Sequence, residues 1–277
     1  MTRKAAPSNR RKAKAASGHP RPHERYSSSG LQDLLFAWFT GHARDLPWRR
    51  TRDPYSILVS EVMLQQTQVA RVVPRYVAFL ERWPTADALA SASPGDVIRE
   101  WQGLGYNRRA LNLHEAAQHI AAKGWPDELT VLPGVGRYTA AAIARFAFDR
   151  PILPVDTNVR RVVERTGGDF GPASAHALMD LGATICLARI PRCDACPLAE
   201  RCPSRGRRYP AERRQSRFEG SFRERRANTL RRVTARALPA AELDPEALSS
   251  LAADGLVEVR QGFAALPGDS GAEFRLS

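Results

Sequence analysis

The chain has 277 residues, of which 43% are hydrophobic, and it carries a formal net charge of +13. This length and composition exclude a largely disordered protein and allow one large or two modest domains with a buried core. No run reaches the roughly 18 apolar residues of a membrane span, and the basic N-terminus lacks the apolar segment of a secretory signal. We therefore expect a cytoplasmic, nucleoid-associated protein with no membrane partner and, from its excess of arginine, a partner rich in phosphate.

The first 27 residues combine Arg and Lys with Ser, Gly, Pro and Ala. This composition predicts a disordered basic tail, which either adds non-specific affinity for DNA or only improves solubility. From residue 28 onward apolar residues recur at helical spacing, and no alternating strand pattern occurs before residue 203. We predict an all-α body over residues 28–203, with helices at about 31–39, 55–67, 69–82, 86–90, 94–101, 107–123 and 140–147.

The apolar helix 55–67 contains one acidic residue, Glu61, and three glutamines, Gln65, Gln66 and Gln68, lie at or just beyond its end. A single glutamate in such a helix is either an ordinary surface residue or a functional acid. Amide side chains at a helix end can hydrogen-bond base edges or fill the gap in an opened duplex. The glutamines therefore indicate contact with nucleic acid more strongly than the glutamate does.

Two glycine-containing turns interrupt the helices. The turn 101–109 places Tyr106 beside arginines, where it is either a core tyrosine or a wedge that stacks into DNA. The turn 132–139 contains Gly134 and Gly136 and ends at Thr139. Backbone amides at such a turn, facing outward at a helix N-terminus, bind phosphate; a plain connection between two helices is the other interpretation.

Asp156 follows this second turn and precedes a helix that begins near Asn158. Aspartate is a favoured helix N-cap, so a purely structural role is available to it. In a chain this basic, an acidic residue close behind a phosphate-binding turn also suggests a carboxylate directed at a nucleic-acid backbone. The two roles are compatible with each other.

All four cysteines of the chain, Cys186, Cys193, Cys196 and Cys202, fall within one short loop, with six, two and five residues between them. In a reducing compartment such a cluster predicts a metal site and not disulfides. Four thiolates suit either one tetrahedral zinc ion or a [4Fe–4S] cluster. A zinc ribbon usually has two Cys-x-x-Cys pairs, and the single pair here favours the cluster.

The C-terminal quarter differs in composition from the body. Residues 204–222 form an arginine-rich linker that includes Arg213 and Arg214. Residues 223–277 predict two helices, at about 223–236 and 245–254, followed by a two-stranded wing at 255–259 and 262–266. This pattern resembles a small winged-helix unit, which either contributes to recognition of DNA or is a packing appendage.

Several motifs together carry a resemblance to a known family. LPGVGRYTA, VDTNVRRV and the spacing of the four cysteines resemble the helix-hairpin-helix (HhH-GPD) DNA glycosylase superfamily, and SEVMLQQTQV, LPWR and WQGLGY resemble its MutY-type adenine DNA glycosylases. The resemblance covers roughly residues 30–203. It implies a two-lobed fold with a [4Fe–4S] loop, a monomer, and a partner that is double-stranded DNA containing mismatched or oxidised base pairs.

The resemblance also implies roles for individual residues. Glu61 matches the general acid that protonates the leaving adenine, Asp156 matches the carboxylate that stabilises the cationic sugar, and Tyr138 and Asn158 match positions that support this chemistry. Because lyase-type relatives carry a lysine where Tyr138 stands, we expect a monofunctional enzyme. The implied DNA-binding residues are Arg44, Trp48, Arg49, Leu64, Gln65, Gln66, Tyr106, Gly134, Gly136 and Thr139, and the implied metal ligands are the four cysteines.

Other features depart from the MutY pattern. Thr157 stands where glycine is usual, Asn107 where a second tyrosine is usual, and His176 where relatives carry Glu or Gln in contact with the base. The segment 158–186 is short, and residues 223–277 do not resemble the Nudix-type domain that many MutY proteins use to recognise 8-oxoguanine. Two other hypotheses stay open: a glycosylase that removes thymine or uracil opposite guanine, and a non-catalytic DNA-binding protein.

Overall fold

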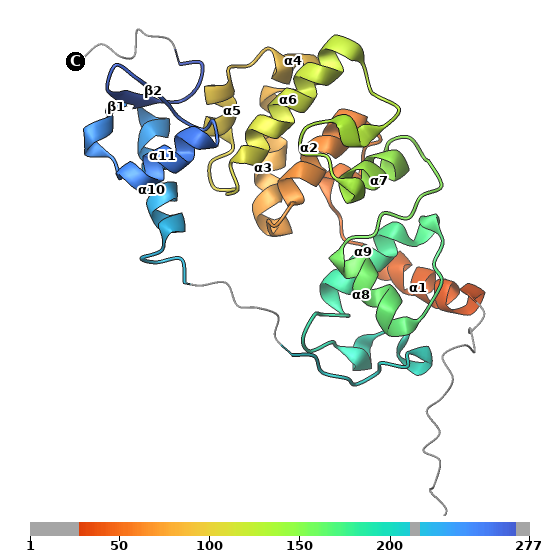
Figure 1. Ribbon diagram of the computed structural model, residues 1–277. Helices are drawn as coiled ribbons and strands as arrows, with labels where there is room; N and C mark the ends of the chain where they lie inside the picture. Colours follow the sequence, from red (N-terminus) through yellow and green to blue (C-terminus); the bar gives the residue numbers. More distant parts are fainter. Residues whose placement is uncertain (1–27, 211–216, 270–277) are drawn as a thin grey trace, which may run out of the picture.

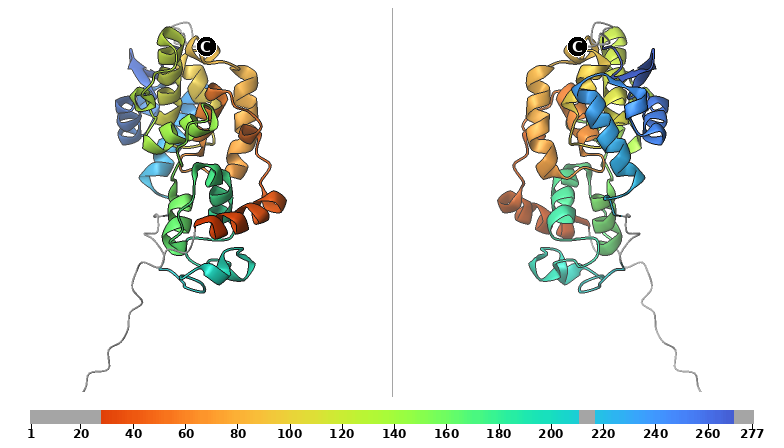
Figure 2. Two further views of the ribbon diagram at one scale, coloured as in Figure 1. Left: turned by 90° about the vertical axis from the view of Figure 1, so that its right-hand side faces the viewer. Right: turned by 90° about the vertical axis from the view of Figure 1, so that its left-hand side faces the viewer.

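The computed structural model describes residues 28–210 and 217–269, and it is mostly helical (Figures 1 and 2). The expected basic tail, together with Arg213 and Arg214 of the linker, lies outside the described residues. No helix in the described ranges is long and apolar enough to cross a membrane.

The chain forms two helical lobes and a small C-terminal unit (Figure 1). One lobe contains α2 (Pro54–Leu64), α3 (Val69–Arg82), α4 (Ala86–Ala90), α5 (Pro94–Glu100), α6 (Arg108–Lys123) and α7 (Arg137–Phe146). The other contains α1 (Ser28–His42), α8 (Thr157–Thr166), α9 (Ala175–Thr184) and the cysteine loop. The chain therefore crosses between the lobes after α1 and again after α7.

Helix α2 is the centre of the first lobe. Asp53 caps its N-terminus by accepting a 2.7 Å hydrogen bond from the Ser56 amide, and Pro54 occupies the first turn, where its missing N–H costs nothing. Every residue from Tyr55 to Met63 except Ser56 is buried. The helix ends at Leu64, three residues before the predicted end, because Gln66 adopts a positive φ of 55° that a helix cannot continue.

The second lobe has its own core, in which α1, α8 and α9 contribute Leu31, Leu35, Val159, Val162, Leu178 and Leu181. Helix α8 begins at its Asp156 cap and ends at Gly167, whose φ of 65° is the left-handed conformation that glycine adopts easily. Helix α9 was not predicted from the sequence. Its short, strongly apolar segment lies between a Gly/Pro-containing stretch and the cysteines, and its helical spacing extends over only ten residues.

The C-terminal unit contains α10 (Phe222–Ala235), α11 (Pro245–Ala253) and a sheet of three strands, β1 (Leu238–Pro239), β2 (Glu258–Arg260) and β3 (Phe263–Ala265). The strand order is β1-β3-β2, and both pairings are antiparallel. The predicted wing of two strands is therefore incomplete, because the two-residue strand β1 pairs with β3 through Leu238 and Ala264. A strand this short has no periodicity that sequence can reveal.

This unit packs directly on α5 and α6 of the first lobe. One apolar core contains Ile98 and Leu111 from the lobe together with Leu230, Leu251 and Leu266 from the unit. The Gly95 amide donates a 2.8 Å hydrogen bond to the Pro267 carbonyl. A Cβ at this glycine would lie 2.8 Å from Asp269 Oδ1 and 3.0 Å from the same carbonyl, so the close approach favours glycine.

Candidate active site

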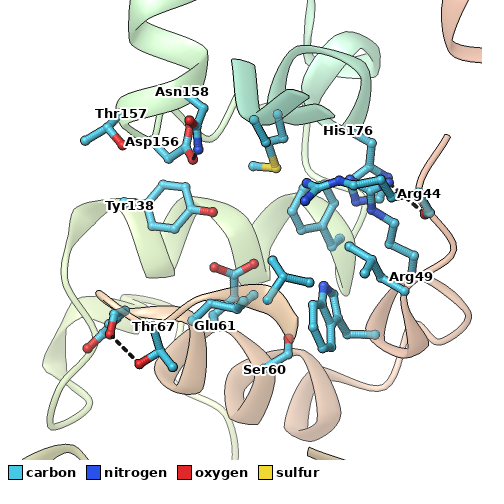
Figure 3. Close-up of a pocket in the computed structure, with 18 of the residues that line it drawn as sticks. Arg44, Arg49, Ser60, Glu61, Thr67, Tyr138, Asp156, Thr157, Asn158 and His176 are labelled. Atoms are coloured by element: carbon cyan, nitrogen blue, oxygen red, sulfur yellow. Dashed lines mark hydrogen bonds between the residues drawn. The ribbon is translucent and has the colours of Figure 1, made fainter. Parts of the chain in front are cut away.

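A cavity of about 680 Å³ lies between the two lobes. Helices α2 and α7 line it from one lobe, and the start of α8 and helix α9 line it from the other (Figure 3). Of the residues singled out in the sequence, the cavity is lined by Arg44, Trp48, Arg49, Glu61, Leu64, Gln65, Gln66, Tyr138, Asp156, Asn158, Thr157 and His176. Residues spread over more than 130 positions of the sequence therefore meet in one place.

Glu61 points from α2 into this cavity, facing the hydroxyl group of Tyr138 (Figure 3). Only 6% of the residue is exposed. Burial raises the pKa of its carboxyl to about 7, an effect that the hydrogen bond with Tyr138 opposes and the charge of Asp156 reinforces. Near neutral pH a large share of Glu61 is therefore protonated and able to donate a proton.

Asp156 faces Glu61 from the opposite lobe, at the N-terminus of α8 (Figure 3). Its Oδ1 accepts a 2.6 Å hydrogen bond from the Val159 amide, and its Oδ2 accepts one of 2.8 Å from the Asn158 side chain. Two N–H donors and the positive end of the α8 dipole therefore meet at this carboxyl. The two acids of the cavity thus have opposite surroundings.

Asn158 is itself held in place by Arg161, which lies three residues further along α8. The Arg161 guanidinium donates to Asn158 Oδ1 at 2.6 Å, and it also donates to the carbonyls of Gly182 and Cys186 at 2.7 and 2.6 Å. These bonds fix the rotamer of the asparagine that contacts Asp156. The position of the carboxylate therefore depends on contacts that reach α9 and the first cysteine.

A buried ion-pair network closes the far end of the cavity. Asp180 on α9 has no exposed side-chain surface and accepts four hydrogen bonds, from Arg44 and Arg49, at 2.6 to 3.0 Å. Burial acts to raise the pKa of Asp180, but the hydrogen bonds from Arg49 and Arg44 outweigh it and hold the pKa below its usual value. The network ties the loop before α2 to the other lobe.

The predicted glycine turn forms as expected and lies beside the cavity. Gly134 has a φ of 75°, and a Cβ there would meet Asn112 at 2.9 Å, so both the conformation and the space require glycine. Gly136 precedes the first residue of α7, which leaves the amides of the turn at a helix N-terminus. Gln65 Nε2 donates to the Gly134 carbonyl at 3.2 Å and to the hydroxyl of the buried Thr139 at 3.4 Å.

Tyr106 stands at the tip of its loop, 53% exposed and with a positive φ of 47°. It is not a core tyrosine. Beneath it the buried Arg109 donates hydrogen bonds to acceptors on two segments: the end of α2, with Val62, Met63, Gln65 and Thr67, and the loop itself, with Leu104, Gly105 and Tyr106. One arginine thus joins the exposed loop to the helix that carries Glu61.

The four cysteines line one small cavity at the edge of the second lobe. Arg165 donates to Cys186 Sγ at 3.5 Å, and the Gly206 amide donates to Cys193 Sγ at 3.3 Å. Burial raises the pKa of Cys196 to about 11 and also raises the pKa of Cys202. Among the described residues, no group of three or more His, Cys, Asp or Glu side chains is arranged to hold a metal ion.

Two residues of the site were missed in the sequence. Arg109 was one of several arginines after the glycines, and nothing in its spacing distinguishes it from the exposed Arg108. Asp180 lies four residues after His176, on the same face of a helix that was itself not predicted. An acid within the apolar sequence of α9 was the available signal, because buried acids need partners.

Comparison with known proteins agrees with this geometry. Residues 59–180 match the family model described as HhH-GPD superfamily base excision DNA repair protein. The adenine DNA glycosylase of Mycolicibacterium smegmatis is 43% identical over 81% of this chain and 91% of its own length. That of Mycobacterium tuberculosis is 42% identical over 85% of this chain and 93% of its own length, and the human one is 38% identical over 65% and 40%.

Solved structures show the same fold. A thermostable thymine-DNA glycosylase matches 64% of this chain and 95% of its own with a TM-score of 0.58 and 27% identity. A trapped covalent intermediate of endonuclease III with DNA matches 63% of this chain and 93% of its own with a TM-score of 0.56 and 25% identity. The part of this chain that these structures leave unmatched is about as long as the N-terminal tail, the linker and the C-terminal unit together.

Proposed function

This chain belongs to the adenine DNA glycosylases of the HhH-GPD superfamily of base excision DNA repair proteins, and we propose that it hydrolyses the N-glycosidic bond of adenine mispaired with 8-oxoguanine or guanine. The partner is double-stranded DNA, bound by a monomer. The observation that carries this proposal is the pair Glu61 and Asp156, two carboxyls in one cavity with opposite surroundings.

Cleavage of an N-glycosidic bond leaves positive charge on the sugar and negative charge on the departing base. A protonated acid assists the base, and an ionised carboxylate assists the sugar, so one site needs two carboxyls in different protonation states. Glu61, with a pKa raised to about 7, supplies the proton to the base. Asp156, held by the amide of Val159 and the side chain of Asn158, supplies the negative charge.

The base must leave the duplex before this chemistry begins. The cavity lies too deep between the lobes for a stacked base, because Glu61 is almost fully buried. We propose that the exposed Tyr106 fills the space that the base vacates, and that the amides of the Gly134–Gly136 turn, at the N-terminus of α7, bind backbone phosphate. Gln65 and Gln66, just beyond the end of α2, also line the cavity.

We propose a [4Fe–4S] cluster bound by Cys186, Cys193, Cys196 and Cys202. The chemistry of the donor set fits this group, because all four cysteines line one cavity and N–H groups donate to the sulfurs of Cys186 and Cys193. Burial raises the pKa of the Cys196 thiol to about 11, so at neutral pH this thiol would lose its proton on binding iron. A bound cluster would hold the loop that Arg161 and Arg165 contact.

The proposed reaction is hydrolysis without strand cleavage. Tyr138 stands on α7 beside both carboxyls, and burial raises the pKa of its hydroxyl above the usual value, so it does not offer an amine or an anion to attack the sugar. A lysine at this position would form a Schiff base with the sugar. Treatment with borohydride during turnover should therefore trap no covalent complex between the protein and DNA.

One panel of duplexes tests the proposal. The protein is incubated with adenine opposite 8-oxoguanine, adenine opposite guanine, thymine opposite guanine and uracil opposite guanine, and alkali then cleaves at abasic sites. We expect strand breaks only in the two adenine duplexes. Strand breaks only in the thymine or uracil duplexes would show that the protein removes those bases and not adenine. No strand breaks in any duplex would show that the protein binds DNA without catalysis.

A further inference from the structure

The C-terminal unit contacts the first lobe through polar groups as well as through the shared apolar core. The loop between α5 and α6 carries Tyr106, and each end of this loop meets the unit. At the first end, Gln102 Nε2 donates a 3.2 Å hydrogen bond to Thr234 Oγ1 on α10. At the other end, where α6 begins, Arg108 Nη1 donates a 2.6 Å hydrogen bond to the Asp254 carbonyl, which follows α11. Two helices of the unit therefore hold the two ends of the loop.

The loop depends on such contacts, because its backbone is tightly folded. Gly103 and Gly105 have φ values of 90° and 73°, and Tyr106, which has a side chain, has a φ of 47°. A non-glycine residue keeps a left-handed conformation only where its surroundings hold it there. Trp101 Nε1 donates to the Gly105 carbonyl at 3.2 Å, and the buried Arg109 donates to the same carbonyl at 2.9 Å. The first lobe thus holds the middle of the loop, and the unit holds its ends.

The two groups that hold the loop are themselves fixed in position. The Thr234 carbonyl accepts a 3.4 Å hydrogen bond from Arg99 Nε on α5, and Arg99 Nη2 pairs with the largely buried carboxylate of Asp269 at 2.7 Å. The Asp254 side chain pairs with Arg226 on α10 at 2.6 Å. These contacts tie α10 to the first lobe and the end of α11 to α10. The unit therefore offers the loop two rigid points of attachment.

The composition of the unit does not fit direct reading of DNA. In helix-turn-helix proteins the second helix lies in the major groove and carries the side chains that contact bases. The second helix here is α11, whose sequence PEALSSLAA contains an acidic residue and no lysine or arginine. Residues 222–269 contain seven arginines and seven acidic residues, so the unit adds nothing to the net charge of +13. This charge balance favours contacts with the protein over contacts with phosphate.

We propose that the C-terminal unit is a positioning element for Tyr106, and that it acts through the hydrogen bonds to Gln102 and Arg108 without contacting DNA. The proposal rests on the proposed function, because it uses Tyr106 as the residue that enters the duplex. A loop held at both ends presents the tyrosine in one conformation, so less conformational entropy is lost when the side chain inserts. Releasing one end should therefore reduce the fraction of molecules whose loop is ready to insert, and should slow excision.

Thr234→Val tests the first contact, because it removes the hydroxyl group with little change of shape. We expect amide hydrogen exchange of the free protein over residues 102–107 to become about fivefold faster, which is the effect of one lost hydrogen bond. Thr234→Ser retains the hydroxyl and should exchange at the original rate. Thr40→Val is the matched control and should change nothing, because Thr40 and Thr234 each donate to the carbonyl four residues earlier but Thr40 lies on α1 in the other lobe.

Arg108→Met tests the second contact in the same exchange measurement, and we expect the same direction of change over residues 102–107. Exchange alone is compared for this variant, because Arg108 is an exposed cation and its removal also weakens the attraction to DNA. Unchanged exchange in both Thr234→Val and Arg108→Met would overturn the proposal, since the loop would then be held without the unit.

Excision shows whether the contact acts through Tyr106. Single-turnover excision of adenine opposite 8-oxoguanine is measured for Thr234→Val, for Tyr106→Ala and for the double variant. We expect Thr234→Val to slow excision about fivefold when Tyr106 is present and by less than about 1.5-fold when it is not, because effects that act through one group are not additive. Thr234→Ser should restore the original rate.

Equal slowing by Thr234→Val with and without Tyr106 would overturn the proposal, because the unit would then act on DNA or on the fold independently of the tyrosine. The proposed function stands in that case, as long as the unsubstituted protein excises adenine. Failure of the unsubstituted protein to excise adenine from any duplex would instead overturn the proposed function and the role in excision that rests on it. Faster exchange in Thr234→Val would even then support the hold of the unit on the loop.

Discussion

The side-chain amide of Asn158 donates a 2.8 Å hydrogen bond to Asp156, the residue that caps the N-terminus of α8. The carboxylate therefore satisfies the helix terminus with one oxygen and binds Asn158 with the other. The structural and the catalytic interpretations of Asp156 describe two different oxygens of the same group. This relationship makes the two roles separable by substitution.

Asp156→Asn should separate them, because asparagine caps a helix as well as aspartate does but carries no charge. We expect a melting temperature close to that of the unsubstituted protein and a fall in single-turnover excision on the order of a hundredfold or more. Circular dichroism melting and excision from the adenine:8-oxoguanine duplex measure the two effects. Retained excision in this folded variant would leave Asp156 with the capping role alone.

Glu61 predicts the pH dependence of excision. Its pKa is raised to about 7, so the protonated form that donates to the base is lost as pH rises through that value. We expect kcat/KM for adenine excision to fall above pH 7 and Glu61→Gln to be inactive throughout. A flat profile between pH 6 and pH 9 would exclude Glu61 as the acid.

The same shift affects stability. Because the folded-state pKa is above the unfolded value of 4.5, the stabilising contribution is complete below pH 4.5 and is lost as pH rises through about 7. Glu61→Gln cannot ionise, so its stability relative to the unsubstituted protein should increase by as much as about 3 kcal/mol between pH 4 and pH 8. Denaturant unfolding at these two pH values measures the difference, and Glu164→Gln, on the exposed side of α8, should show none.

Shortening the side chain of Arg109 is expected to destabilise the protein more than any other single truncation near the exposed loop. It donates to acceptors on both α2 and the loop, and most of these would be left buried without a partner in Arg109→Met. We expect a loss of about 3 kcal/mol or more in the free energy of unfolding. Arg108→Met removes an exposed neighbour whose main contacts are the Asp254 carbonyl and a 3.9 Å pairing with Glu115, and it should cost less than 1 kcal/mol.

The cysteine loop predicts a coloured protein. Anaerobically purified protein should contain about four irons and four sulfides per chain and should lack zinc. Cys196→Ser should lower the iron content and also weaken excision, because the loop holds Arg161, which in turn holds Asn158. A colourless protein with one zinc ion per chain and full excision would contradict the cluster.

Much of the first lobe was predictable because its helices repeat apolar residues over many turns, and the predicted helices 69–82 and 86–90 agree with the structure at both ends. Helix α9 and strand β1 were not, because ten and two residues are too short for periodicity to appear above the local composition. The family resemblance implied that Glu61, Tyr138 and Asp156 act on one bond, and these residues, spread over 95 positions of the sequence, do line one cavity. Arg109 and Asp180 escaped because the partners that join them to other segments lie far away in the sequence.

The shared packing of Ile98 and Leu111 with Leu230, Leu251 and Leu266 has a consequence for how the protein unfolds. The C-terminal unit follows the cysteine loop through a linker, yet its apolar interior is completed by Ile98 and Leu111, which lie in helices well before that loop in the sequence. Cutting the chain between α9 and α10 and separating the two fragments would therefore expose apolar surface on both of them. The protein should melt as one cooperative body, and neither fragment should be soluble when expressed alone.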